Sequence, residues 1–165
     1  MAEEPVDVYD HILLSAGCTR SVRLHCRKVR EAAREYVIDG VVDRDLVEAG
    51  AALHDIGRAK THSIAHGQVG ADICREMGLP EEIARIVECH VGAGIPPCEC
   101  ILLGLAPRDC VPFTIEERIV AHADNTVQGQ QITLLPETVM TASLLPRKIR
   151  RRLYRLALEM HLFRA

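Results

Sequence analysis

Several histidines and aspartates lie where helical side chains would point into a core. His25 falls three residues after Val22 and four before Val29, so all three share one helix face. His66, His90 and Asp124 are spaced in the same way from apolar residues. A lone histidine in such a place is more often a hydrogen-bonded core residue. A cluster is different, because a buried carboxylate must pair with a cation or share a metal ion.

His54 and Asp55 are adjacent, and Ile56 and Gly57 follow at a sharp turn near the expected end of a helix. Neighbouring side chains on a helix diverge by about 100°, so both can reach one ion only if it lies at the helix edge. Imidazole and carboxylate together suit zinc, iron, manganese or nickel. The dipeptide alone is weak evidence for such a site.

The elements that must position these residues are helices. Apolar residues recur at intervals of three and four along most of the chain, and glycines and prolines separate the repeats. The pattern predicts an all-α fold. Helices are expected at about residues 21–39, 43–57, 63–78, 81–91 and 114–127, followed by a short helix from Pro136 and an amphipathic C-terminal helix from Pro146.

Residues 92–113 contain four prolines and are expected to form a long loop. The short apolar stretch at 101–105 is expected to form one or two helical turns. Long loops of this kind often serve as lids.

A length of 165 residues predicts a single domain over residues 1–165, with a core motif region at about 20–128 and C-terminal helices at 136–163. The net charge of −3 gives no global attraction to nucleic acid or to an anionic membrane. Only 3% of the residues are aromatic, which leaves little material for stacking on bases. Nucleic acid is therefore an unfavoured partner.

The seven cysteines are an odd number, and neither a secretory signal nor an apolar run of about 20 residues is present. These features predict a cytoplasmic chain with reduced thiols and no membrane span. Cys98 and Cys100 form a close pair without a second pair at zinc-binding spacing, so partly buried thiols are favoured over a structural zinc ion.

Taken in order, these motifs resemble the HD-domain metal-dependent phosphohydrolase superfamily. The resemblance spans residues 20–128 and rests on His25, His54-Asp55-Ile56-Gly57, His66-Gly67, His90 and Ala123-Asp124. The strings "THSIAHGQVGA", "ECHVGAGI" and "AHADNTVQG" further resemble a group of small archaeal HDIG proteins.

The resemblance implies an HD-domain helical bundle that binds one or two divalent ions, with Fe, Mn, Zn, Ni and Mg as the candidates. In that family, the residues that match His25, His54, Asp55 and Asp124 hold the first ion. Relatives with extra histidines hold a second ion through residues placed like His66 and His90, with the aspartate of the HD pair bridging. Some of those relatives have a double histidine at the later position, whereas this chain has His90-Val91.

The implied reaction is hydrolysis of a nucleotide-like phosphoester by water that a metal ion activates. Asp55, Arg58 and Lys60 are the expected catalytic residues. Arg58 stands where lysine is commoner after "HDIG", and it keeps a cation that can bind phosphate in a bidentate manner. A solvated loop is an equally good interpretation of Arg58 and Lys60.

The remaining basic residues carry less information. His122 precedes Asp124 by two residues and should project from the other side of its helix, while His62 is expected at the surface. His11 and His161 lie outside the matched region. The cationic run that begins at Arg147 could contact nucleic acid or a phosphorylated partner, but a solvated helix face is the more usual role.

Two other functions fit the same residues. An HD-fold di-iron oxygenase uses a similar set of six ligands, and a sequence does not reveal the redox state of a metal. A metal-binding module without catalysis is the third interpretation, although buried carboxylates without a use are costly to keep. The substrate, among mononucleotides, cyclic dinucleotides, dinucleoside polyphosphates and short RNA ends, stays open, as does the oligomeric state.

Overall fold

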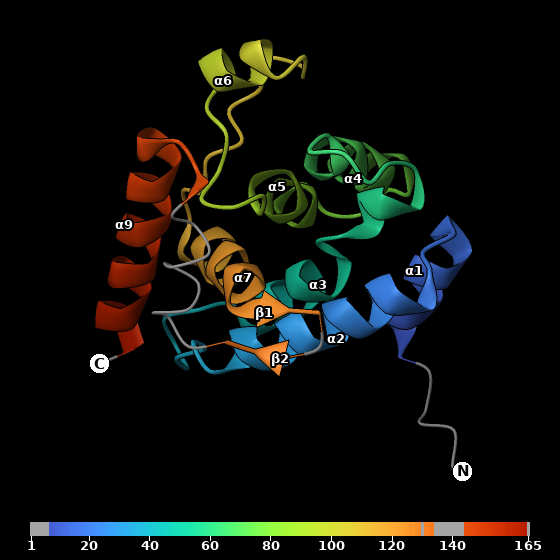
Figure 1. The fold of residues 1–165 in the computed structure, drawn as a ribbon. Coiled ribbons are helices and arrows are strands. Elements are labelled where there is room, and N and C mark those ends of the chain that lie inside the picture. The colour runs from blue at the N-terminus through green and yellow to red at the C-terminus, as the bar shows by residue number, and fades with distance from the viewer. Residues whose placement is uncertain (1–6, 130, 134–143, 165) are drawn as a thin grey trace.

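A computed structural model describes residues 7–129, 131–133 and 144–164, and nearly all of the regular secondary structure in this part of the chain is helical (Figure 1). The helical elements are α1 (Val8–Ala16), α2 (Arg20–Arg34), α3 (Arg44–Leu53), the 3₁₀ turn η1 (Ile56–Ala59), α4 (His66–Glu76), α5 (Glu81–Cys89), α6 (Pro97–Leu102), α7 (Ile115–Thr126) and α9 (Arg147–Arg164). A two-stranded antiparallel hairpin, β1 (Val127–Gln128) and β2 (Gln131–Ile132), follows α7. The expected all-α fold is confirmed.

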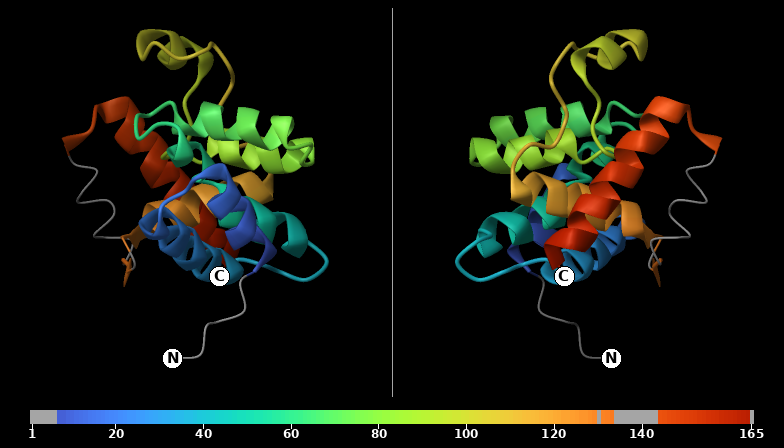
Figure 2. Two further views of the ribbon diagram at one scale, coloured as in Figure 1. Left: turned by 90° about the vertical axis from the view of Figure 1, so that its right-hand side faces the viewer. Right: turned by 90° about the vertical axis from the view of Figure 1, so that its left-hand side faces the viewer.

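Two apolar clusters hold the helices together. The first lies among α2, α3, α7 and α9 and contains fully buried residues such as Val29, Ile119 and Met160. The second joins α1, α3, α4 and α5 through residues such as Leu53 and Val87. Helices α4 and α5 lie side by side, and α9 packs against α7 at one side of the molecule (Figures 1 and 2).

The local signals explain where several helices begin and end. The Thr114 side chain accepts a hydrogen bond from the Glu117 backbone N–H, and the Thr114 backbone N–H donates one to the Glu117 carboxylate, so the expected capping box is present. The Asp43 carboxylate caps α3 by accepting from the Leu46 N–H. Gly78 ends α4 with a φ of 73°, a left-handed conformation that favours glycine.

Some element boundaries differ from those expected. Helix α2 ends at Arg34, because the N–H groups of Tyr36 and Val37 bond to carbonyls three residues earlier and tighten the chain before Gly40. Helix α3 ends at Leu53, and a 3₁₀ turn replaces its expected last turn. Helix α1 was not among the expected elements. The helix expected from Pro136 lies outside the described residues.

Residues 92–113 form an arm that projects from the helical body and carries α6 at its tip (Figures 1 and 2). Its helical turns begin at Pro97 rather than at residue 101, because proline suits the first position of a helix. The Gln68 amide fastens the arm to α4: its NH₂ group donates to the Ala106 carbonyl at 2.8 Å, and its oxygen accepts from the Ala106 N–H at 3.1 Å.

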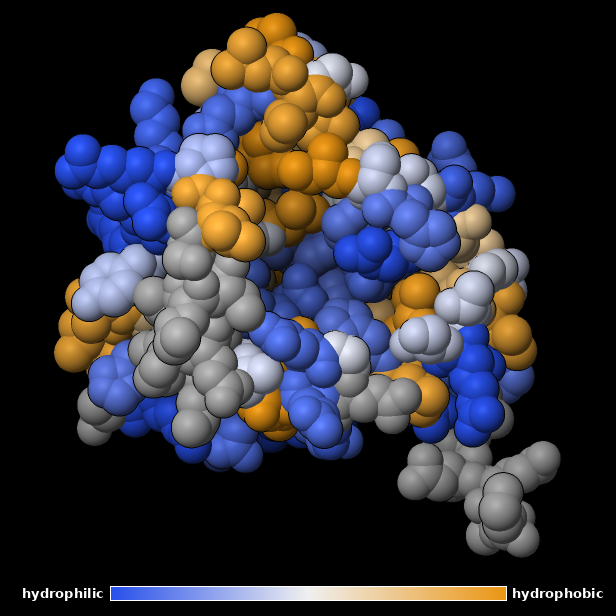
Figure 3. Space-filling model, in the orientation of Figure 1, coloured by the Kyte–Doolittle hydropathy of each residue, from blue (hydrophilic) through white to orange (hydrophobic). Residues whose placement is uncertain are grey.

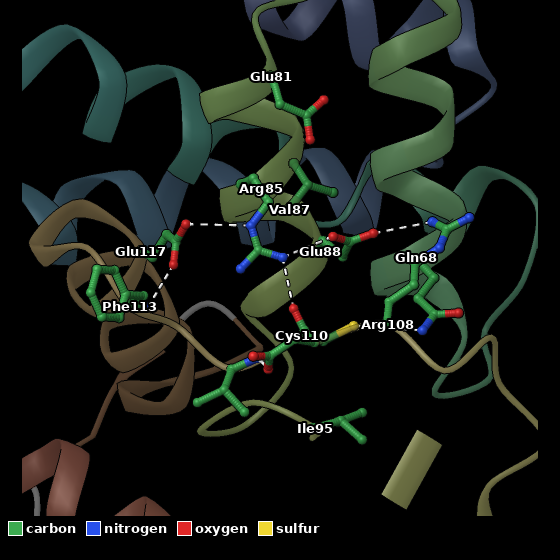
Figure 4. Close-up of polar contacts among 12 residues, drawn as sticks. Gln68, Glu81, Arg85, Val87, Glu88, Ile95, Arg108, Cys110, Phe113 and Glu117 are labelled. Carbon is green, nitrogen blue, oxygen red and sulfur yellow. Dashed lines mark hydrogen bonds and ion pairs between the residues drawn. The ribbon is translucent and has the colours of Figure 1, made fainter. Parts of the chain in front are cut away.

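A buried carboxylate on α5 lies where the arm joins the helical body. Glu88, which is 4% exposed, receives hydrogen bonds from Arg75, Arg85 and Arg108. Figure 4 shows Glu88 between Arg85 and Arg108. Arg85 also donates to the Asp109 carbonyl at 2.7 Å. The three guanidinium groups thus join α4, α5 and the arm through one acceptor.

We expect Glu88→Ala to lower the free energy of unfolding by about 2 kcal/mol, because three partly buried guanidinium groups lose their shared acceptor. Urea unfolding of the two proteins measures this difference. Glu81→Ala is the matched control: Glu81 also binds Arg75, but its side chain is 60% exposed, and removing it should cost less than about 1 kcal/mol. Equal losses in the two variants would contradict a structural role for the buried network.

No helix in residues 7–129, 131–133 and 144–164 is both long enough and apolar enough to cross a membrane.

Candidate metal centre

The side chains predicted as metal ligands come together from five parts of the chain. One atom from each residue lies within 4.8 Å of the others in three overlapping groups, which are His25–His54–Asp55, His54–His90–Asp124 and Asp55–His66–His90. The ends of α3 and α5, the beginning of α4 and the adjoining faces of α2 and α7 supply these residues. All six predicted ligands therefore belong to one cluster.

Close packing at Gly57 holds two parts of the cluster together. A Cβ atom on Gly57 would lie 1.9 Å from the His66 carbonyl oxygen and 2.7 Å from the Gly70 backbone nitrogen. Only glycine lets η1 approach the first turn of α4 so closely. This contact brings Asp55, at the start of η1, next to His66 at the start of α4.

Three histidines are oriented by their own helices. Nδ1 of His54, His66 and His90 lies 2.7–2.8 Å from the carbonyl oxygen three residues earlier in the chain. A carbonyl only accepts, so Nδ1 carries the proton and Nε2 of the neutral ring carries a lone pair. Backbone anchoring of this kind is typical of metal-binding histidines, because it fixes both tautomer and ring orientation.

The acceptor atoms of these side chains face one another, and two of them have no hydrogen-bond donor. Nε2 of His54 and Oδ1 of Asp55 are buried and have no hydrogen-bond partner in the described structure. Nε2 of His66 lies 3.1 Å from Nε2 of His90, which sets two lone pairs against each other when both rings are neutral. A cation would satisfy all of these atoms, so the residues fit a divalent metal ion.

The protonation states of the two aspartates suit a cation as well. Burial raises the pKa of Asp55, but His54 and His90 lower it further, so the pKa lies below its usual range. Burial also raises the pKa of Asp124, whereas the hydrogen bond from His25 and the nearby His54 ring hold it well below its usual range. Both side chains are therefore carboxylates at neutral pH.

The histidines divide into two kinds. Burial and the neighbouring His90 lower the pKa of His66 to about 4, which leaves its ring neutral at pH 7. Burial also lowers the pKa of His54, but Cys26 and Asp55 raise it well above its usual value. A metal ion that binds His54 would therefore displace a proton.

Arg58 and Lys60, the two expected phosphate-binding cations, lie in different surroundings. Arg58 Nε donates to Asp55 Oδ2 at 2.6 Å, and the guanidinium lines the open pocket beside the cluster. Lys60 is exposed at the end of η1 and does not line this pocket. Three residues make one turn of a 3₁₀ helix, so positions two apart face different directions. The structure thus brings Arg58 to the cluster and leaves Lys60 outside it.

The pocket has a volume of about 530 Å³ and opens to solvent. Figure 3 shows a hollow with a hydrophilic floor on the face of the molecule that carries the β1–β2 hairpin. The pocket is lined by Ser21, Val22, His25, Asp55, Arg58, Gln128, Gly129 and Gln131. The arm at 92–113 contributes no residue to the lining of this pocket.

The hairpin residues of the pocket were missed by sequence reasoning. Gln128 and Gln131 follow the Asp124 motif, and the Gly129 carbonyl oxygen lies 3.3 Å from His25 Nδ1. The glycine at the end of the string "NTVQG" is the sequence signal that could have revealed this turn. In the structure Gly129 has a φ of 62°, a left-handed conformation that favours glycine.

The other histidines lie away from the cluster. His122 is buried and contacts the Tyr36 hydroxyl through Nε2 at 3.0 Å, on the opposite side of α7 from Asp124. This position agrees with the expected helix phase. His11, His62 and His161 are exposed and belong to none of the three groups.

The ends of α3 and α5, the start of α4 and the facing sides of α2 and α7 bring four histidines and two aspartates together, which defines the class of all-α proteins with a cluster of metal-ligand side chains. The sequence model of the HD domain matches residues 22–128. The chain therefore belongs to the HD domain family, and the resemblance stated from its motifs is confirmed.

The relatives include small archaeal proteins and larger ones. The chain is 50% identical to an uncharacterized protein of Methanocaldococcus jannaschii over 71% of the chain and 72% of that protein. It is 54% identical to a tRNA (cytidine(56)-2′-O)-methyltransferase of Picrophilus torridus over 76% of the chain, but it spans only 37% of that protein. It is also 35% identical to Ribonuclease Y of Pseudothermotoga lettingae over 50% of the chain and 17% of that relative.

A solved structure has the same fold. The HD domain of the L. monocytogenes phosphodiesterase PgpH aligns with a TM-score of 0.55 at 15% identity, over 97% of this chain and 98% of that one.

Proposed function

We propose that the protein is a metal-dependent phosphohydrolase that cleaves a nucleotide-like phosphoester with activated water. The observation that carries this proposal is the set of three histidines that backbone carbonyls hold with Nε2 facing two carboxylates. Divalent ions held by such ligands generate a nucleophile from water near neutral pH and stabilise negative charge on a phosphoryl group.

Two sets of ligands are available within the cluster. His25, His54, Asp55 and Asp124 would hold the first ion. His66 and His90 would hold a second ion together with Asp55, whose Oδ1 lies 3.3 Å and 3.6 Å from their respective Nε2 atoms. The second set has fewer protein ligands and leaves more positions for water and substrate.

Arg58 is placed to bind the phosphate. Its Nε donates to Asp55 and one of its NH₂ groups lies 3.5 Å from His66 Nε2, which leaves the remaining N–H groups for phosphate oxygens in the pocket. The open pocket admits part of a large substrate, because its mouth is not closed by the arm. The names of the relatives, which include a ribonuclease and a tRNA-modifying enzyme, support an RNA phosphodiester as one candidate.

The direct test is to measure the metal content of the purified protein and then to assay phosphoesters with that metal. We expect release of nitrophenol from bis(p-nitrophenyl) phosphate, and loss of this activity after chelation. Consumption of oxygen with an organic substrate, without hydrolysis of any phosphoester, would instead favour the di-iron oxygenase.

We expect Arg58→Ala to lower kcat/KM for a phosphodiester by about tenfold to a hundredfold and to leave the metal content unchanged, because a guanidinium binds phosphate and does not bind cations. Steady-state kinetics and metal analysis of the same preparation measure both quantities. Arg58→Lys should recover part of the loss, since it keeps the charge and loses the bidentate geometry. If Arg58→Ala had the same kinetics as the parent, Arg58 would be interpreted as a solvated loop residue without a role in substrate binding.

A further inference from the structure

The charge of this protein is strongly segregated. Residues 147–164, which form α9, contain seven Lys or Arg residues and one acidic residue, a net charge of +6, whereas the rest of the chain carries −9. The first acidic residue within α9 is Glu159, in its C-terminal half. The net charge of −3 for the whole chain thus conceals a cationic surface on one helix.

Arg147 and Lys148 lie at the N-terminal end of α9, where positive charge destabilises a helix. The N-terminal end of a helix carries a partial positive charge, so acidic residues stabilise the first turn and basic residues destabilise it. The first turn of α9 has no acidic residue. Arg147, Lys148 and Arg151 also repel one another at this end. A sequence that breaks a local stability rule is often serving a function at that place.

The cations face solvent, because the other side of α9 is fixed in the core. Leu156 and Met160 are 5% and 1% exposed. Arg147, Arg151 and Arg155 recur at intervals of four, so they line one exposed face over two turns. The Arg155 side chain is 82% exposed. We call Arg147, Lys148, Arg151 and Arg155 the cationic face.

The N-terminal half of α9 packs, through Leu153, against a residue that follows one of the candidate metal ligands. Leu153 would be 3.8 Å from a Cβ atom on Gly92, which is two residues after His90. The Gly92 carbonyl accepts a hydrogen bond from Asn125, the neighbour of Asp124. Arg152 is tied to Glu99 of the arm by two hydrogen bonds. In Figure 3 the hydrophilic N-terminal half of α9 lies at one side of the hollow.

We infer that the cationic face binds the phosphate backbone of an RNA strand whose scissile phosphate occupies the metal centre. This inference rests on the proposed phosphohydrolase function and names a substrate class for it. α9 lies outside residues 22–128, so this surface is additional to the HD domain proper. Because Arg and Lys contact phosphates and few aromatic side chains are present, binding is independent of base sequence.

RNA fits this surface better than an anionic membrane does. A helix that lies in a membrane interface has apolar residues along one whole face, with cations beside them. In α9 the continuous apolar face is already buried against the helical body through Leu156, Ala157 and Met160, and the exposed Tyr154, Leu158 and Leu162 are interleaved with charged residues. The cationic face therefore presents Arg and Lys side chains without a continuous apolar face beside them.

The test compares two triple variants with equal changes of charge. Arg147→Gln, Arg151→Gln and Arg155→Gln remove the cationic face. Lys28→Gln, Arg34→Gln and Arg44→Gln remove three cations from α2 and α3, where these side chains are 32%, 48% and 55% exposed. Binding of a short fluorescent phosphorothioate RNA, which resists cleavage, is measured by anisotropy with the metal-loaded full chain.

We expect the first triple variant to bind RNA about tenfold to a hundredfold more weakly than the parent. The slope of log affinity against log salt should become shallower by about 2, because each lost contact with single-stranded phosphate contributes about 0.7. The control triple should change affinity by about twofold or less. The thermal midpoint of the first variant should equal or exceed that of the parent, because cations near the start of α9 are removed.

Three results would overturn the inference: no RNA binding by the parent, equal losses in both triple variants, or binding to phosphatidylserine vesicles in place of RNA. Hydrolysis of bis(p-nitrophenyl) phosphate separates this inference from the proposed function. Retained hydrolysis without RNA binding removes only the cationic-face assignment. RNA binding that depends on the cationic face, without hydrolysis by any variant, removes the phosphohydrolase and leaves the binding surface.

Discussion

Replacement of Asp55 by alanine is expected to abolish hydrolysis and the retention of metal. Asp55 is 4% exposed and belongs to two of the three ligand groups. Its Oδ1 faces His66 and His90, and its Oδ2 lies 3.8 Å and 3.9 Å from Nε2 of His54 and His25. Without this carboxylate the imidazoles have no negative partner at their centre. We expect turnover to fall by roughly a thousandfold or more.

Metal analysis of the purified variant and turnover of bis(p-nitrophenyl) phosphate measure the two losses, and circular dichroism shows whether the helices remain. Asp72→Ala is a matched control on α4. Its carboxylate is 45% exposed and binds Arg108 at the foot of the arm, so its removal should leave metal and turnover near those of the parent. An Asp55→Ala protein with full metal and full activity would remove the central assignment.

The second large effect concerns the number of ions. We expect the parent to bind two ions when metal is plentiful, and His66→Ala combined with His90→Ala to bind one. The two rings face each other with Nε2 atoms 3.1 Å apart, and both lie near Asp55 Oδ1. His25, His54 and Asp124 are untouched by these changes, so the first ion should stay bound. Phosphodiester cleavage should fall by about a hundredfold or more, because one of two ions that stabilise the reacting phosphoryl group is lost.

Titration with metal under excess, followed by removal of the free ion and metal analysis, gives the count for each protein. The control removes two other histidines, with His62→Ala and His122→Ala, which belong to none of the ligand groups. His122 is buried against Tyr36, so this control loses some stability while it keeps two ions. If the parent bound a single ion under excess metal, His66 and His90 would revert to core or substrate-contact roles.

Several helix boundaries and side-chain directions could be predicted from residues close together in the chain. The capping box at Thr114, the stop at Gly78 and the proline before α9 depend on neighbours a few positions away, and each marks a helix boundary in the structure. Helical periodicity also predicts that His25 points toward the ligand cluster and that His122 points to the opposite side of α7 from Asp124. The boundaries that differed, at the ends of α2 and α3, lie where tight turns compete with helix continuation.

The sequence by itself determined which residues are candidate ligands, on which helices they lie and toward which side they turn, because side-chain chemistry and helical period are local properties. Tertiary structure alone decided that Arg58 and not Lys60 meets Asp55, that a hairpin and not the arm lines the pocket, and that α9 packs against Gly92 through Leu153. These results depend on contacts between residues far apart in the chain. Such contacts are set by how whole helices pack, and no short pattern of residues encodes that packing.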